Sequence, residues 1–138
     1  LYGMSHGGAS PPRDDPVPPD VTARVSRVQA LPEHLLLVAV SGAEMIGYAW
    51  VQDYGPGLRR WWSVARLHDL YVAPGARRRG IGRALIMAVR EWATGRETVK
   101  YLEWQASQAA VPFYERLGLQ GDTRADLEEH PFFEITLR

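Results

Sequence analysis

Apolar residues recur along the chain with periods that change from segment to segment, and these changes divide it into predicted elements. Valines at helical spacing within residues 21–30 predict a helix, with Asp20 as its N-terminal cap and Pro32 stopping it. Residues 35–40 (LLLVAV) and 45–53 (MIGYAWVQD) are rich in strand-forming side chains and are separated by a Ser-Gly-Ala turn. These two segments predict a β-hairpin.

The pattern in the middle of the chain predicts a strand followed by a helix. Residues 64–72 (VARLHDLYV) favour a strand, which Pro74 ends because proline cannot donate to a strand ladder. Residues 82–94 then place apolar side chains at helical spacing, and we expect Gly95 to end that helix in the left-handed conformation.

The remaining sequence continues this succession. Residues 99–105 (VKYLEWQ) predict a strand, 109–117 a helix closed by Gly118, and 119–122 and 132–137 a terminal pair of strands. Taken in order, the elements predict a mixed α/β domain with one strand-helix-strand crossover at its centre.

Length and composition restrict the function classes. A chain of 138 residues suits one domain, which we place at residues 21–138. Residues 1–20 hold five of the ten prolines and predict a disordered tail, whose residues ahead of Met4 are candidates for an expression remnant. This tail lacks the pattern of a signal peptide, so we expect a cytoplasmic protein. No segment approaches the roughly 18 apolar residues of a membrane span, so we expect no membrane association.

Charge and cysteine content exclude further classes. The absence of cysteine excludes disulfides, thiolate catalysis and cysteine-bound zinc, and the four histidines show no metal-ligand spacing, so no metal is expected. The 16 basic and 16 acidic side chains balance, so no overall field attracts nucleic acid. Any site for a polyanion must therefore be local.

One such local site is predicted at residues 77–83 (RRRGIGR), between the central strand and helix. A helix start exposes unpaired amide N–H groups and the positive end of the helix dipole, and glycines let the backbone close around an anion. The spacing excludes a Walker-type ATP loop. A solvated basic turn is the structural alternative.

Two longer segments around this site resemble a known family. Residues 67–85 (LHDLYVAPGARRRGIGRAL) resemble the acetyl-coenzyme A signature of the GCN5-related N-acetyltransferases (GNAT), and residues 110–118 (AVPFYERLG) resemble their second signature. The resemblance covers roughly residues 34–138, and LEWQ at 102–105 is most similar to diamine and small-amine acetyltransferases. It implies a GNAT-like mixed, mostly antiparallel sheet with a strand-helix-strand-helix acyl-CoA-binding core and an abbreviated amino-terminal part.

The resemblance also implies a binding site for acetyl-CoA as co-substrate. Arg77, Gly80 and Gly82 match the pyrophosphate loop, with the amides of residues 78–84 as donors, and Val72 matches the strand-end residue whose backbone pairs with the pantetheine arm. Ser107 stands where relatives often have asparagine. The full implied set is Leu70, Tyr71, Val72, Arg77, Arg78, Arg79, Gly80, Ile81, Gly82, Arg83, Ala84, Ser107 and Phe113.

The implied catalytic residues are Tyr114, His68 and Asp69. Tyr114 matches the tyrosine beside the coenzyme sulfur, where a phenol can hydrogen-bond or protonate the departing thiolate; the alternative is a core aromatic. Strict alternation puts His68 on the strand face of Val72, as a general base or a buried structural histidine, and puts Asp69 on the other face unless a bulge intervenes. Glu103 is a weaker candidate.

The predicted activity is direct transfer of the acetyl group from acetyl-CoA to a primary amine, with a small molecule as the favoured acceptor. Aromatic rings and a carboxylate could surround a cationic amine, although ordinary hairpin packing is the favoured explanation for them; they are Tyr48, Trp50, Asp53, Tyr54, Trp61 and Trp62. The alternative function is a non-catalytic or partner-regulated acyl-CoA-binding module. Exposed terminal strands make a homodimer a further prediction, and Pro112 is expected to start or bend the last helix.

Overall fold

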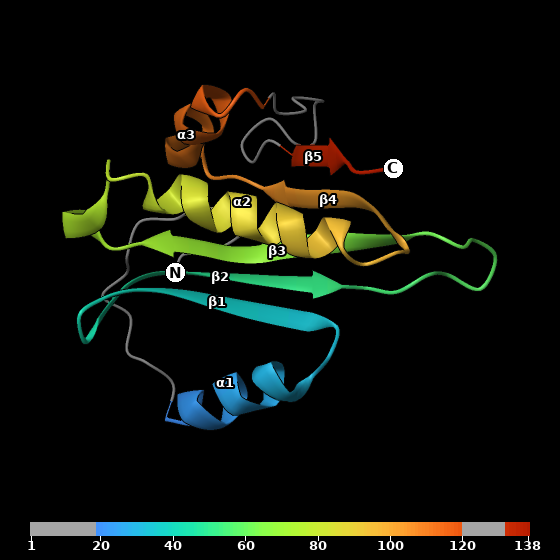
Figure 1. Ribbon diagram of the computed structural model, residues 1–138, viewed down its shortest axis with the longest axis horizontal. Coiled ribbons are helices and arrows are strands. Elements are labelled where there is room, and N and C mark those ends of the chain that lie inside the picture. Colours follow the sequence, from blue (N-terminus) through green and yellow to red (C-terminus); the bar gives the residue numbers. More distant parts are fainter. Residues whose placement is uncertain (1–18, 120–131) are drawn as a thin grey trace.

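The computed structural model describes residues 19–119 and 132–138, which form a five-stranded sheet and the helices around it (Figure 1). Residues 1–18 of the predicted tail therefore lie outside the described residues. The elements, in chain order, are α1 (Val21–Ala30), β1 (His34–Ser41), β2 (Glu44–Asp53), β3 (Ser63–Val72), the short 3₁₀ helix η1 (Pro74–Ala76), α2 (Ile81–Thr94), β4 (Val99–Gln105), η2 (Gln108–Ala110), α3 (Val111–Arg116) and β5 (Phe132–Thr136).

The strands lie in the order β1-β2-β3-β4-β5. All neighbours are antiparallel except β3 and β4, which are parallel because α2 carries the chain back across the sheet between them. The predicted mixed, mostly antiparallel sheet with one central crossover is confirmed. No helix within the described ranges is long and apolar enough to cross a membrane.

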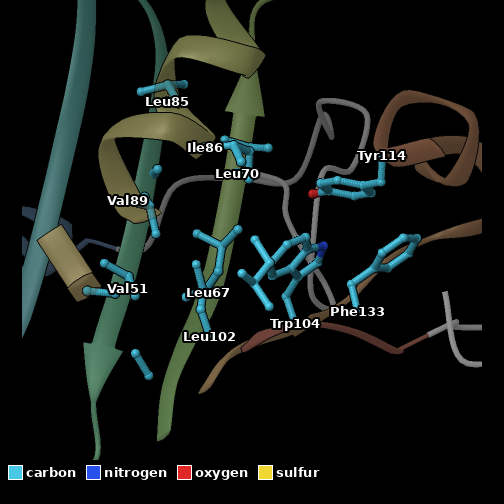
Figure 2. Packing of buried hydrophobic residues seen from close by; sticks show 14 of the residues in the cluster. Val51, Leu67, Leu70, Leu85, Ile86, Val89, Leu102, Trp104, Tyr114 and Phe133 are labelled. Carbon is cyan, nitrogen blue, oxygen red and sulfur yellow. The ribbon is translucent and has the colours of Figure 1, made fainter. Parts of the chain in front are cut away.

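Helix α2 lies along one face of the sheet and supplies much of the core (Figure 1). The residues that α2 buries recur once per helical turn on one side of the helix, as the helical spacing predicts; they are Leu85, Ile86, Val89 and Ala93. They pack against alternate residues of the strands, among them Val51, Leu67 and Leu102, which are inaccessible to solvent (Figure 2). This packing holds the start of α2 against the end of β3.

Two predicted helix ends form differently. Asp20 precedes α1 but makes no capping hydrogen bond, because its carboxylate pairs with Arg24 at 3.0 Å instead. Gly95 follows α2 in the right-handed conformation (φ −73°), so the expected left-handed ending is wrong there. The chain continues turning in the same sense beyond it, since the Arg96 N–H donates to the Ala93 carbonyl at 3.1 Å.

The last predicted helix is shorter than its apolar pattern suggests. It begins as η2 and continues as α3, with Pro112 in the first turn of α3, so the proline starts this helix. Gly118 follows in the left-handed conformation (φ 85°). The predicted strand at 119–122 lies almost entirely outside the described residues, whereas β5 is present and pairs with β4.

Candidate active site between strands β3 and β4

Strands β3 and β4 separate partway along their length. Their pairing runs from Ser63 opposite Val99 to Arg66 opposite Glu103. Beyond that point β3 continues to Val72, while the end of β4 pairs with β5. Among the described residues, the later half of β3 therefore has no strand partner on its β4 side. Its backbone groups need hydrogen-bond partners, so the opening suits an extended ligand.

The loop and helix that follow β3 present backbone amides to this opening. Gly80, just before α2, has a positive φ of 78°, which glycine adopts without steric cost, and Arg78 has a positive φ of 65°. The first turn of α2 contains no acidic residue and no side-chain cap. The Ala84 amide donates to the Gly80 carbonyl at 3.0 Å, so it is not available as the predicted anion donor. The amides of residues 81–83 have no partner within the helix.

A cleft of about 760 Å³ lies between the end of β3, the start of α2 and α3. It brings together most of the predicted coenzyme-binding residues, namely Leu70, Val72, Arg77, Arg78, Gly80, Ile81, Gly82, Arg83 and Phe113. Tyr71, Arg79, Ala84 and Ser107 do not line it. It also includes residues that the sequence reasoning missed, namely Ala76, Ala109, Ala110, Arg116 and Leu117.

The end of β3 is held by a side chain from the basic loop. The Arg77 Nε–H donates to the Val72 carbonyl at 3.1 Å. Val72 itself packs toward the start of α2 and lines the cleft. The carbonyl at the strand end is thus already engaged by a donor that a ligand amide can replace.

A β-bulge in β3 changes the predicted direction of His68 but not that of Asp69. Trp50 of β2 lies opposite Asp69, but the next residue, Val51, lies opposite Leu67, which leaves His68 without a counterpart. Val51 and Leu67 face the core, so Trp50 and its partner Asp69 face the opposite side of the sheet. Asp69 therefore lies on the face opposite Val72, as alternation predicts, whereas the bulge places His68 on the same face as Asp69.

His68 lies on this second face and not on the face of Val72. Its Nε2 atom is 3.0 Å from Oε1 of Gln52 and 3.3 Å from the Tyr54 hydroxyl, and its ring centroid lies 4.4 Å from that of Trp50 with the rings tilted by 36°. Burial, followed by the positive charge of Arg66 and by His34, lowers the pKa of His68 to about 4. The imidazole is therefore neutral and weakly basic near pH 7.

Asp69 has the opposite electrostatic character. Burial raises the pKa of its carboxyl group to about 6. The group is mostly ionised near neutral pH, yet it binds a proton more readily than an exposed aspartate. Of the two adjacent candidates, Asp69 has the basicity that proton removal near neutral pH requires.

Tyr114 is fully buried on α3 and does not line the cleft, whereas the adjacent Phe113 does. The ring centroid of Tyr114 lies 5.2 Å from that of Trp104 and 5.0 Å from that of Phe133 (Figure 2). The indole N–H of Trp104 is buried there without a hydrogen-bond partner among the described residues. The tyrosine thus lies in an aromatic cluster at the inner side of the opening.

The predicted acceptor residues divide into two groups. Asp53 is structural, since it is buried, accepts a 2.7 Å bond from Arg96 and binds the Gly55 amide at 2.8 Å. Burial alone would raise the pKa of Asp53, but the hydrogen bonds from Arg96, Gly55 and Ser63 outweigh it and lower the pKa. Trp62 is also engaged, because the guanidinium of Arg60 lies 4.0 Å above its ring.

The second group remains near Asp69. Trp50 and Tyr54 contact His68, and Tyr48 packs against Tyr71 with ring centroids 5.9 Å apart. Trp61 is 62% exposed and contributes to neither group of contacts.

Glu103, the weaker candidate base, pairs with Arg66 at 3.4 Å. Its pKa is raised because burial outweighs this charge. Among the described residues, no group of three histidine, aspartate and glutamate side chains could hold a metal ion.

The profile of the acetyltransferase (GNAT) family matches residues 9–119. The chain is 34% identical over 108 residues to the N-alpha-acetyltransferase RimI of Mycobacterium tuberculosis, covering 78% of this chain and 63% of RimI. It is 35% identical over 74 residues to aminoglycoside N(6′)-acetyltransferase type 1 of Klebsiella aerogenes, covering 52% of this chain and 48% of that enzyme. The chain thus spans less than two thirds of either relative.

A solved structure shows the same arrangement of elements. The PaiA N-acetyltransferase of Thermoplasma acidophilum, in complex with coenzyme A, is similar with a TM-score of 0.67 and 16% identity. The similarity covers 84% of this chain and 69% of the other. At this identity the likeness concerns the fold.

Proposed function

Because the chain belongs to the acetyltransferase (GNAT) family, we propose that it transfers the acetyl group of acetyl-CoA to a primary amine of a small molecule, by direct attack within a ternary complex. The observation that carries the proposal is the opening between β3 and β4. The cleft at the start of α2 lies on one side of the unpaired part of β3, and Asp69 of the same strand faces the other side. Donor and acceptor can therefore meet from opposite faces.

The donor is bound by backbone groups in this proposal. The amides of residues 81–83 and the positive end of the α2 dipole bind the diphosphate, with Arg78 beside them. The pantetheine arm extends along the unpaired edge of β3 and takes the Val72 carbonyl in exchange for Arg77. This exchange replaces one hydrogen bond with another, so it costs little free energy.

The acceptor amine approaches from the face that carries Trp50 and Asp69. Asp69 removes a proton from the ammonium group, and the freed nitrogen lone pair attacks the thioester carbonyl. The C–S bond then breaks, the nitrogen gives up its second proton to water, and the sulfur leaves as a thiolate. Asp69 is better suited to this step than its neighbour because its pKa of about 6 exceeds that of His68, about 4. The imidazole of His68 is hydrogen-bonded to Gln52 and contacts Trp50, so it holds the side chains on this face of the site in place.

Tyr114 stabilises the departing sulfur. In Figure 2 its hydroxyl points away from α3 and toward β3. A phenol has a pKa of about 10 and a thiol about 8.5, so complete proton transfer is uphill without a shift. The hydroxyl therefore acts chiefly by hydrogen bonding to the thiolate.

The acceptor class is tested by release of free thiol from acetyl-CoA against grouped amines. The groups are diamines and polyamines, amino acids, aminoglycosides, and peptides with free amino termini, the last two because of the names of the relatives. We expect release with small-molecule amines. Release with peptides alone would contradict the proposed acceptor class. Binding of acetyl-CoA without release in any group would instead identify a non-catalytic acyl-CoA-binding module.

A further inference from the structure

Two arginines from different helices line the cleft beside the proposed diphosphate site. Arg83 belongs to the first turn of α2, and Arg116 is the last residue of α3. Both side chains are exposed, and neither forms an ion pair with the described residues. The cleft that both residues line has no aspartate or glutamate among its lining residues, so the two guanidinium groups favour a ligand that carries concentrated negative charge.

The position of Arg116 is set by the contact between the two helices. Phe113 packs on Gly82 at the start of α2. Arg116 follows Phe113 by three residues, so it lies on the same side of α3, about 4.5 Å farther along the axis. Arg83 and Arg116 therefore flank the anion site from its two helical walls.

We propose that Arg83 and Arg116 bind the 3′-phosphate of the coenzyme adenosine and make the protein discriminate against donors that lack it. This inference rests on the proposed function. In the proposed function the amides of residues 81–83 hold the diphosphate together with Arg78 and the displaced Arg77 of the loop, and the two arginines on the helices remain for the second phosphate group. A phosphomonoester carries almost two negative charges near pH 7, and guanidinium forks match its oxygens.

The test compares acetyl-CoA with 3′-dephospho-acetyl-CoA as donors. KM for each is measured by thiol release, and the affinities of coenzyme A and dephospho-coenzyme A by calorimetry, for the wild type, Arg83→Gln, Arg116→Gln and the double variant. Arg90→Gln is the matched control, because Arg90 is exposed on α2 and does not line the cleft. Circular dichroism verifies that each variant is folded.

We expect the wild type to prefer the phosphorylated donor by about 10-fold or more, the double variant to lose this preference, and Arg90→Gln to retain it. The double variant should lose affinity for the phosphorylated donor only. Equal affinity of the wild type for both donors, or an unchanged preference in the double variant, would overturn the inference while leaving the proposed function intact. Failure of the wild type to bind either donor would overturn both.

Discussion

A β-carbon placed on Gly82 would lie 3.0 Å from Cζ of Phe113, so the aromatic ring packs directly on the glycine backbone. This contact joins the start of α2 to α3 at the floor of the cleft. The two sequence signatures, separated along the chain, are therefore in direct contact, and the absence of a side chain at position 82 allows it.

Gly82→Ala should weaken donor binding by displacing the Phe113 ring into the cleft. We expect KM for acetyl-CoA to rise by about 10-fold, although alanine is the better helix former by up to about 1 kcal/mol. Gly75→Ala is the matched control, because a β-carbon there meets no atom within 4 Å. Adding Phe113→Leu to Gly82→Ala should recover part of the loss. An unchanged KM in Gly82→Ala would show that the ring does not shape the donor site.

Asp69→Asn should lower kcat by about 10²-fold if Asp69 is the general base. The wild-type rate should rise with pH through about 6, where the carboxyl group ionises, and the variant should lose this dependence. His68→Gln should cost less than 10-fold, because a histidine of pKa about 4 contributes little as a base. A larger loss in His68→Gln than in Asp69→Asn would reverse the assignment.

Asp69→Asn should affect stability differently from activity, because it lowers kcat but does not lower the melting temperature. The pKa of Asp69 is raised from 3.8 to about 6 on folding, so the folded state holds the proton more tightly than the unfolded state. The contribution of Asp69 to stability therefore declines as pH rises from about 4 to 6, and at pH 7 the buried charge destabilises the fold. Asp69→Asn should melt at the same temperature as the wild type or higher at pH 7, and a lower melting temperature would contradict this.

Tyr114→Phe should lower kcat by about 10²-fold or more while leaving coenzyme affinity intact, because it removes the hydroxyl and keeps the ring. The ring retains its contacts with Trp104 and Phe133. Steady-state kinetics with calorimetry of coenzyme A binding separate the two effects. Near-normal turnover would leave Tyr114 with a purely structural role in the aromatic cluster.

Asp53→Asn should destabilise the fold by about 1–3 kcal/mol, because it weakens the charged bonds to Arg96 and the Gly55 amide. Since the pKa of Asp53 is lowered on folding, its carboxylate contributes stability above the ordinary value of 3.8 and loses it as pH falls below that value. Urea unfolding at pH 7 and pH 3 measures both effects. Asp20→Asn, in the exposed pair with Arg24, is the control and should change stability less.

Elements with strong local patterns could be predicted closely from the sequence. The helix at Val21–Ala30 and the strand at Val99–Gln105 have the predicted bounds, because valine spacing and strand-forming residues favour them without distant partners. The anion loop at 77–83 could be placed for the same reason, since its glycines and the helix start are adjacent in the chain.

Features that depend on distant partners could not be predicted. The bulge at His68 arises from its pairing with β2, so alternation within β3 alone gave the wrong face. The structural role of Asp53 depends on its partner Arg96, 43 residues away along the chain, which no local pattern indicates. Arg116 lay within the second signature but could be assigned to the cleft only once α3 was placed against α2.

A crystal structure of the chain with coenzyme A tests the central claim most directly. The account predicts diphosphate oxygens within hydrogen-bond distance of the amides of residues 81–83, and the sulfur atom in the opening between β3 and β4. A coenzyme bound elsewhere, or a diphosphate that does not contact the start of α2, would contradict it.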